Sequence, residues 1–292
     1  MQQVLPARSV LRRLSGWTIL LAGMAYGLSQ FVLLLQQQPA VRYAFYAGLI
    51  AAAATALGTL PALVSARLSA RSNAAMLGFG GGVMLAASIF SLLLPAQTLF
   101  TQYSSAFGHY YLVLALVSGM ALLLLLERLI PHEHFIKGTE GQQALALKRS
   151  WLFVLAIMLH NIPEGLAIGA AYAGGEAVGA TALAMGIAIQ DLPEGLVIAM
   201  ALLAVGYRRR TAVLVGSLSG LTEPIMAVLG ASVLVTASVF LPWGLALAAG
   251  AMLFVISHEI IPESHRQGHE LSATLGLLLG FILMLLLDSQ FG

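Results

Sequence analysis

Two short segments of this chain combine an acid with other metal-binding side chains in nearly the same order. The first reads HNIPEG over residues 160–165, and the second reads QDLPEG over residues 190–195. In each segment the first residue and the glutamate are four positions apart, so on a helix the two side chains would share one face. Imidazole, amide and carboxylate groups are ligands for zinc, cadmium, ferrous iron and manganese. The spacing therefore predicts two helices that each present metal ligands.

Four acids fall near the middle of long apolar runs: Glu164, Asp191, Glu194 and Glu223. An acid at the centre of a membrane span costs at least ~2.5–3.5 kcal/mol. No Lys or Arg lies at the same depth along the sequence to neutralise these acids. They must be protonated or neutralised by cations, and two divalent ions would carry the matching charge. The motifs add further ligand candidates, namely His160, Asn161 and Gln190.

The elements that must position these residues are membrane-spanning helices. Hydrophobic residues make up 59% of the 292 residues and charged residues only 9%, whereas a soluble domain averages roughly 25% charged residues. A helix needs about 20 apolar residues to cross the hydrocarbon core. We predict an all-α integral membrane protein with about nine spans, at residues 16–36, 43–66, 74–97, 109–131, 151–173, 178–204, 212–235, 241–262 and 271–289.

The two motifs lie on consecutive spans, which run antiparallel. They would therefore meet about a pseudo-two-fold axis near the midplane, as in transporters built from inverted repeats. We predict one transmembrane domain over residues 43–289 with a cytoplasmic loop at 132–150. It would be preceded by a cytoplasmic segment (1–15) and an extra N-terminal helix (16–36).

Basic residues favour the cytoplasmic side of a membrane. With a cytoplasmic N-terminus and an external C-terminus, every Lys and Arg except Arg42 falls on or beside the cytoplasmic side. We therefore expect a multi-pass protein of the cell (inner) membrane. A group of polar residues also falls toward this side and suggests a metal exit. It comprises His258, Glu259, His269, His132, His134 and, as a further contact, Glu127.

The paired motifs, followed by HEIIPESH over residues 258–265, resemble the ZIP (Zrt/Irt-like protein) family of divalent-metal transporters. The resemblance covers residues 43–289 and implies transport of zinc and related ions, such as cadmium, into the cytoplasm. It also implies a homodimer and an elevator-type motion, in which spans two, five, six and seven move against the rest.

The resemblance further implies a binuclear site. One metal would bind His160, Glu164, Gln190 and Glu194, with Met84 contributing. The second would bind Asn161, Asp191 and Glu223, with Glu164 and Glu194 bridging. Ser91 would be a polar residue of the entrance, although the outer end of its span carries no acid.

Other functions are compatible with buried acids. An intramembrane di-metal enzyme is one alternative, but di-iron bundles use Glu-x-x-His and metalloproteases use His-Glu-x-x-His. After His258 and Glu259 the next histidine is His265, so the protease motif fails. A metal-selective channel and an ion-coupled carrier of organic solutes are further alternatives. The net charge of +2 gives no case for a nucleic-acid partner, the absence of cysteine excludes thiolate ligands, and we expect no catalytic cofactor.

Overall fold

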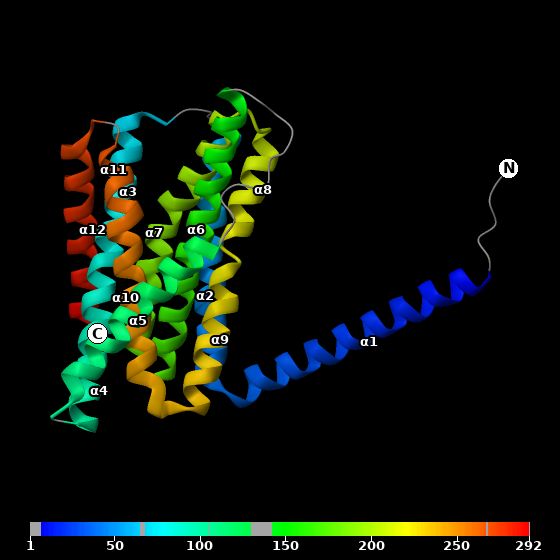
Figure 1. The fold of residues 1–292 in the computed structure, drawn as a ribbon, viewed down its shortest axis with the longest axis horizontal. Helices are drawn as coiled ribbons and strands as arrows, with labels where there is room; N and C mark the ends of the chain where they lie inside the picture. The colour runs from blue at the N-terminus through cyan, green and yellow to red at the C-terminus, as the bar shows by residue number, and fades with distance from the viewer. Residues whose placement is uncertain (1–6, 65–67, 105, 130–141, 267, 292) are drawn as a thin grey trace.

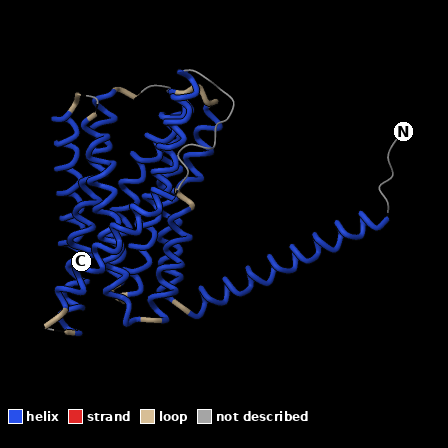
Figure 2. The backbone as a smooth tube through the Cα atoms, in the orientation of Figure 1, coloured by secondary structure: helices blue, strands red, loops and turns tan. Residues whose placement is uncertain are grey.

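The structure is a computed structural model that describes residues 7–64, 68–104, 106–129, 142–266 and 268–291. Within these residues every regular element is a helix (Figure 2). Eight helical segments in this part of the chain are long and apolar enough to cross a membrane: Ser15–Gln37, Pro39–Leu63, Ala70–Tyr103, Gly108–Leu126, Ala177–Ala204, Arg209–Thr236, Ser238–His265 and Glu270–Gln290. Each coincides with a predicted span. The remaining predicted span, 151–173, falls in α6 (Gln142–Ala173), so the all-α membrane class is confirmed.

The helices alternate in direction along the bundle. Figure 1 shows α3, α8 and α11 beginning or ending at one end of the bundle, with α4 and the turn between α9 and α10 at the other.

Besides α6, the elements are, in chain order, α1 (Ala7–Gln37), α2 (Pro39–Thr59), η1 (Leu60–Leu63), α3 (Ala70–Ala86), η2 (Ala87–Leu93), α4 (Leu94–Tyr103), α5 (Gly108–Leu129), α7 (Ala177–Ala204), α8 (Arg209–Ser219), α9 (Thr222–Thr236), η3 (Ser238–Phe240), α10 (Leu241–Val255), η4 (Ile256–Ile260), α11 (Ile261–His265) and α12 (Glu270–Phe291).

The bundle consists of two groups of helices. We call α2, α6, α7, α8 and α9 the carboxylate bundle, because they pack most closely on one another and include both motifs. We call α3 to α5 and α10 to α12, with η2 and η4, the framework bundle, in which α3 packs along α12 and α5 along α10. The two bundles meet mainly where α6 contacts α10 and where α7 contacts α3 and α12.

Glycine makes the packing tight inside each bundle. In the carboxylate bundle, a Cβ on Gly58 would collide with the backbone of Leu192, and a Cβ on Gly195 would collide with the backbone of Thr55. Small residues let helix backbones approach closely in a membrane. Across the boundary between the bundles, Gly186 instead faces the side chain of Met284. The backbones are therefore locked together within a bundle, and side chains separate the two bundles.

Besides the second predicted span, which ends in the 3₁₀ helix η1, three predicted spans are not single α-helices. The seventh span is divided into α8 and α9, with Gly220 and Leu221 between them, just before Pro224. The third and eighth spans each contain a π-helical segment, η2 and η4, immediately before a helix with proline in its first turn. π-helical turns occur frequently at functional sites. Periodicity alone predicts the spans but not these breaks.

Two apolar surfaces of the described residues are largely exposed. Helix α1 extends away from the bundle in Figure 1, and no residue of its apolar stretch from Ser15 to Gln37 is buried. Its contact with α2 includes Phe31 on Phe45, with ring centroids 5.2 Å apart. Helices α8 and α9 carry a continuous exposed stripe of aliphatic side chains: Leu214, Leu218, Leu221, Ile225, Leu229 and Val233.

Candidate metal centre

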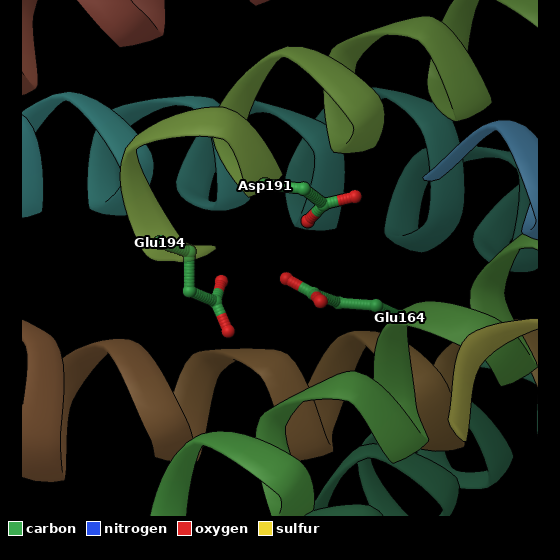
Figure 3. A group of neighbouring side chains, drawn as sticks. All are labelled: Glu164, Asp191 and Glu194. Carbon is green, nitrogen blue, oxygen red and sulfur yellow. The ribbon is translucent and has the colours of Figure 1, made fainter. Parts of the chain in front are cut away.

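The two motif helices bring three carboxylates together. Glu164 lies on α6, while Asp191 and Glu194 lie on α7. Each offers an oxygen within 4.8 Å of the others, and Figure 3 shows the three side chains pointing toward one another. Part of this geometry follows from the motif, because Asp191 and Glu194 are three positions apart and share a helix face, and the packing of α6 on α7 adds Glu164. The three carboxylates can surround a cation.

The remaining ligand candidates are connected to this group. The side-chain amide of Gln190 donates a hydrogen bond to Glu164 Oε1. Asn161 Nδ2 donates to Glu223 Oε1 at 3.2 Å and to the carbonyl oxygen of Ser219 at 3.2 Å. Asn161 therefore joins α6 to the break between α8 and α9 and brings Glu223 to the site.

Glu223 occupies the first turn of α9. The break before α9 makes this turn a helix N-terminus within a candidate membrane span, where the helix dipole favours negative charge. Discontinuous helices with their ends at mid-depth form ion sites in transporters. The division of the seventh span thus supplies part of the electrostatic support that a buried carboxylate needs.

The site is buried, and each predicted ligand keeps at least one polar atom without a hydrogen-bond partner. His160, Asn161, Glu164, Gln190, Asp191 and Glu223 are each at most 2% exposed. Among the described residues, the buried side-chain nitrogen and oxygen atoms without a hydrogen-bond partner all belong to the predicted ligands. They are His160 Nδ1 and Nε2, Asn161 Oδ1, Glu164 Oε2, Gln190 Oε1, Asp191 Oδ2, Glu194 Oε1 and Glu223 Oε2.

An unsatisfied buried polar group costs about 1–3 kcal/mol, and more when it is charged. Among the described residues, Arg266 pairs with Glu263, and His160 Nε2 lies 3.1 Å from Glu259 Oε2. Neither of these ion pairs includes Glu164, Asp191, Glu194 or Glu223. Several unpaired acceptor atoms gathered at one place are typical of a cation-binding site.

A cavity of about 280 Å³ opens from this site. Its inner wall includes His160, Gln190, Glu194 and Met84. Met84 is buried on α3 and comes from the framework bundle. The cavity continues past His258 and Glu259 to Glu263 and Arg266. It therefore connects the ligand group with the predicted exit at one end of the bundle.

The other predicted exit residues are less closely connected. His269 precedes α12, is half-buried and does not line this cavity. His132 and His134 lie outside the described residues, as does the side chain of Glu127. The structure thus links His258 and Glu259 to the site and leaves the other four as predictions.

Ser91, the predicted entrance residue, lies in η2, and its Oγ donates to Asp288 Oδ1 at 2.8 Å. Asp288 comes from the last turns of α12. The third span itself has no acid at its outer end, and the contact brings one from a helix 197 residues further along the chain.

Sequence reasoning missed residues that support or line the site. Thr55 on α2 contacts Glu223, and Glu263 and Arg266 line the cavity mouth. Glu263 could have been found from its position, four residues after Glu259 on the same helical segment. Thr55 carries no such signal, because an isolated threonine in an alanine-rich run is an ordinary membrane-helix residue.

Comparison with known proteins identifies relatives of the whole bundle. Residues 132–288 match the family described as ZIP zinc transporter. The zinc transporter ZIPB of Bordetella bronchiseptica is 46% identical over 254 residues, which cover 86% of this chain and 82% of that protein. The zinc transporter GufA of Myxococcus xanthus is 42% identical over 248 residues, covering 84% and 98%. Human zinc transporter ZIP11 is 35% identical over 151 residues, half of this chain.

Proposed function

Because this chain belongs to the ZIP family of zinc transporters, which are transporters and not enzymes, we propose that it carries zinc and related divalent ions into the cytoplasm. Cadmium, ferrous iron and manganese accept overlapping ligands. The observation that carries this proposal is the set of unpaired buried atoms, all on the predicted ligand residues. A transported cation is the group that would satisfy these atoms.

We propose a binuclear site near the middle of the membrane. The first metal binds His160, Glu164, Gln190 and Glu194, beside Met84. The second binds Asn161, Asp191 and Glu223, with Glu164 and Glu194 bridging. The short distances among Glu164, Asp191 and Glu194 support bridging. Two divalent ions would balance the negative charge of the four carboxylates. In the ion pairs of the described residues, no Lys or Arg contacts these carboxylates.

The cavity and the distribution of basic residues support release of metal on the cytoplasmic side. The cavity leads from the ligands to Arg266, at the bundle end where α3 begins with Arg71 and where α8 begins with Arg209 and Arg210. Arg42 lies near the start of α2, at the opposite end. Basic residues favour the cytoplasm, so we assign the cavity to the cytoplasmic side as a release path past Glu259.

The division into two bundles supports an elevator-type motion. The spans that the family resemblance assigns to the moving body are the helices of the carboxylate bundle. Their backbones interlock at glycines such as Gly58 and Gly195, whereas Gly186 faces a framework side chain across the boundary. Met84, contributed by the framework, would leave the first metal when the carboxylate bundle moves.

At the opposite end, we propose that Ser91 and Asp288 receive the incoming metal. Their oxygen atoms, 2.8 Å apart, replace the acid that the third span lacks. The homodimer and the inner-membrane location stay predictions.

The test is zinc uptake into proteoliposomes that contain the purified full chain. We expect Glu194→Ala and His160→Ala each to reduce initial uptake at subsaturating zinc by at least ~10-fold, because even loss of an outer partner of a metal ligand costs ~10–100-fold. Glu176→Ala, which removes an exposed acid before α7, is the matched control. Wild-type uptake in both site variants would overturn the site assignment.

A further inference from the structure

We infer that Thr55 is a positioning residue for the second metal, an inference that rests on the proposed binuclear site. Thr55 lies in α2, carries no charge and is 1% exposed. Its hydroxyl lies 3.3 Å from the carbonyl oxygen of Ala51 and 3.4 Å from Glu223 Oε1. It is therefore a buried donor shared between its own helix and a predicted metal ligand.

The two oxygens of Glu223 have different surroundings. Oε1 receives the hydroxyl of Thr55 and the side-chain amide of Asn161, the latter at 3.2 Å. Oε2 is buried and has no hydrogen-bond partner. Two donors on one oxygen fix the rotation of the carboxylate and leave the other oxygen to face the metal. Outer-shell hydrogen bonds of this kind orient metal ligands.

The backbone around Thr55 leaves its side chain little freedom to move. The backbone of Gly195, the last residue of the second motif, packs on the backbone of Thr55. On the other side, a Cβ on Gly220 would come within 2.9 Å of Thr55 Cβ and Oγ1. Thr55 is thus held between the motif of α7 and the break that precedes α9. Only glycine at these two positions allows the threonine to reach Glu223.

The contact also belongs entirely to the carboxylate bundle, since α2 and α9 are both part of it. A motion of that bundle against the framework would carry Thr55 and Glu223 together. The hydroxyl would therefore orient Glu223 throughout the transport cycle, whereas Met84 serves the first metal in only one position. Thr55 is expected to govern retention of the second metal and not access to the site.

Thr55→Val tests this inference, because valine keeps the shape and removes the hydroxyl. Thr59→Val is the matched control. Thr59 lies one turn further along α2 and is buried. Its hydroxyl donates to the carbonyl of Ala56 at 2.7 Å and lies 3.3 Å from the hydroxyl of Ser217, and neither of these partners is a carboxylate. Thr55→Ser keeps the hydroxyl and should restore the wild-type behaviour.

The measurement is zinc and cadmium bound per chain at equilibrium dialysis of the purified full-length protein, with affinities from calorimetry. We expect two ions for wild type, Thr55→Ser and Thr59→Val. For Thr55→Val we expect one of the two binding steps to lose ~10–100-fold in affinity, with the other step unchanged. Equal second-step affinity in wild type and Thr55→Val overturns the inference, and so does equal loss in Thr59→Val. Fewer than two ions on wild type would instead overturn the binuclear site.

Discussion

Several predicted ligands of this site hydrogen-bond to the protein through one side-chain atom and leave a second atom unpaired. Asn161 and Gln190 each donate through nitrogen to a neighbouring carboxylate, and each retains an unpaired oxygen. Glu164 and Glu223 each accept on Oε1 and leave Oε2 unpaired. The donor groups are thereby paired inside the protein, while unpaired acceptor atoms gather at the site. Such an arrangement attracts cations and offers anions little.

This arrangement predicts that bound metal stabilises the protein. It also predicts that, in the absence of metal, neutralising one of the carboxylates stabilises the protein. We expect zinc to raise the thermal midpoint of wild type, since a ligand at 100 times its Kd contributes ~2.7 kcal/mol. Glu164→Gln removes one of the crowded carboxylates. It should raise the midpoint in chelator and lose most of the zinc-dependent shift, as measured by thermal denaturation in detergent.

Glu176→Gln is the control for this experiment, because its exposed side chain lies outside the site. A full zinc-dependent shift in Glu164→Gln would contradict the assignment of Glu164 as a bridging ligand.

At the residue level, the motif ligands could be predicted because helical spacing is local. His160 and Glu164 share a face whatever the rest of the chain does. The contacts of His160 with Glu259, of Thr55 with Glu223 and of Ser91 with Asp288 join residues that are far apart in the sequence. They depend on which helices pack together, and a single sequence does not contain that information in its periodicity.

Among the elements, apolar length predicts the spans well, because the thickness of the hydrocarbon core sets it. The interruptions are harder to predict. Proline alone does not decide them, since α6 and α7 run on past Pro163 and Pro193 while the seventh span breaks just before Pro224. The difference lies in packing. At that break Gly220 allows the close approach of Thr55, and Asn161 binds the carbonyl of Ser219.

The glycine contacts predict which pairs of helices need a close approach of their backbones for stability. Gly58→Ala places a methyl group against the backbone of Leu192, two residues before Glu194. We expect α2 and α7 to separate, with a loss of stability of ~1–3 kcal/mol from overpacking and a reduced rate of zinc uptake. Thermal denaturation and proteoliposome uptake measure the two effects.

Gly27→Ala provides the comparison, because a Cβ at Gly27 on α1 meets nothing within 4 Å. Wild-type stability in Gly58→Ala would mean that the backbones of α2 and α7 are not locked together at this point.

At the scale of the whole molecule, the proposed orientation of the protein in the membrane can be measured. The chain has no cysteine, so a single introduced cysteine is the only thiol. Glu263→Cys, at the cavity mouth, should react with a membrane-impermeant maleimide in inside-out vesicles and not in right-side-out vesicles. Tyr103→Cys, exposed at the opposite end of the bundle, should show the reverse. The opposite pattern would reverse the assigned direction of release.

The aliphatic stripe on α8 and α9, from Leu214 to Val233, lies on the carboxylate bundle. It contains no aromatic or charged side chain that would anchor it to the head groups. In the elevator-type motion proposed above, this stripe would move along the acyl chains of the lipid. The viscosity of the lipid would then contribute to the rate of each transport cycle.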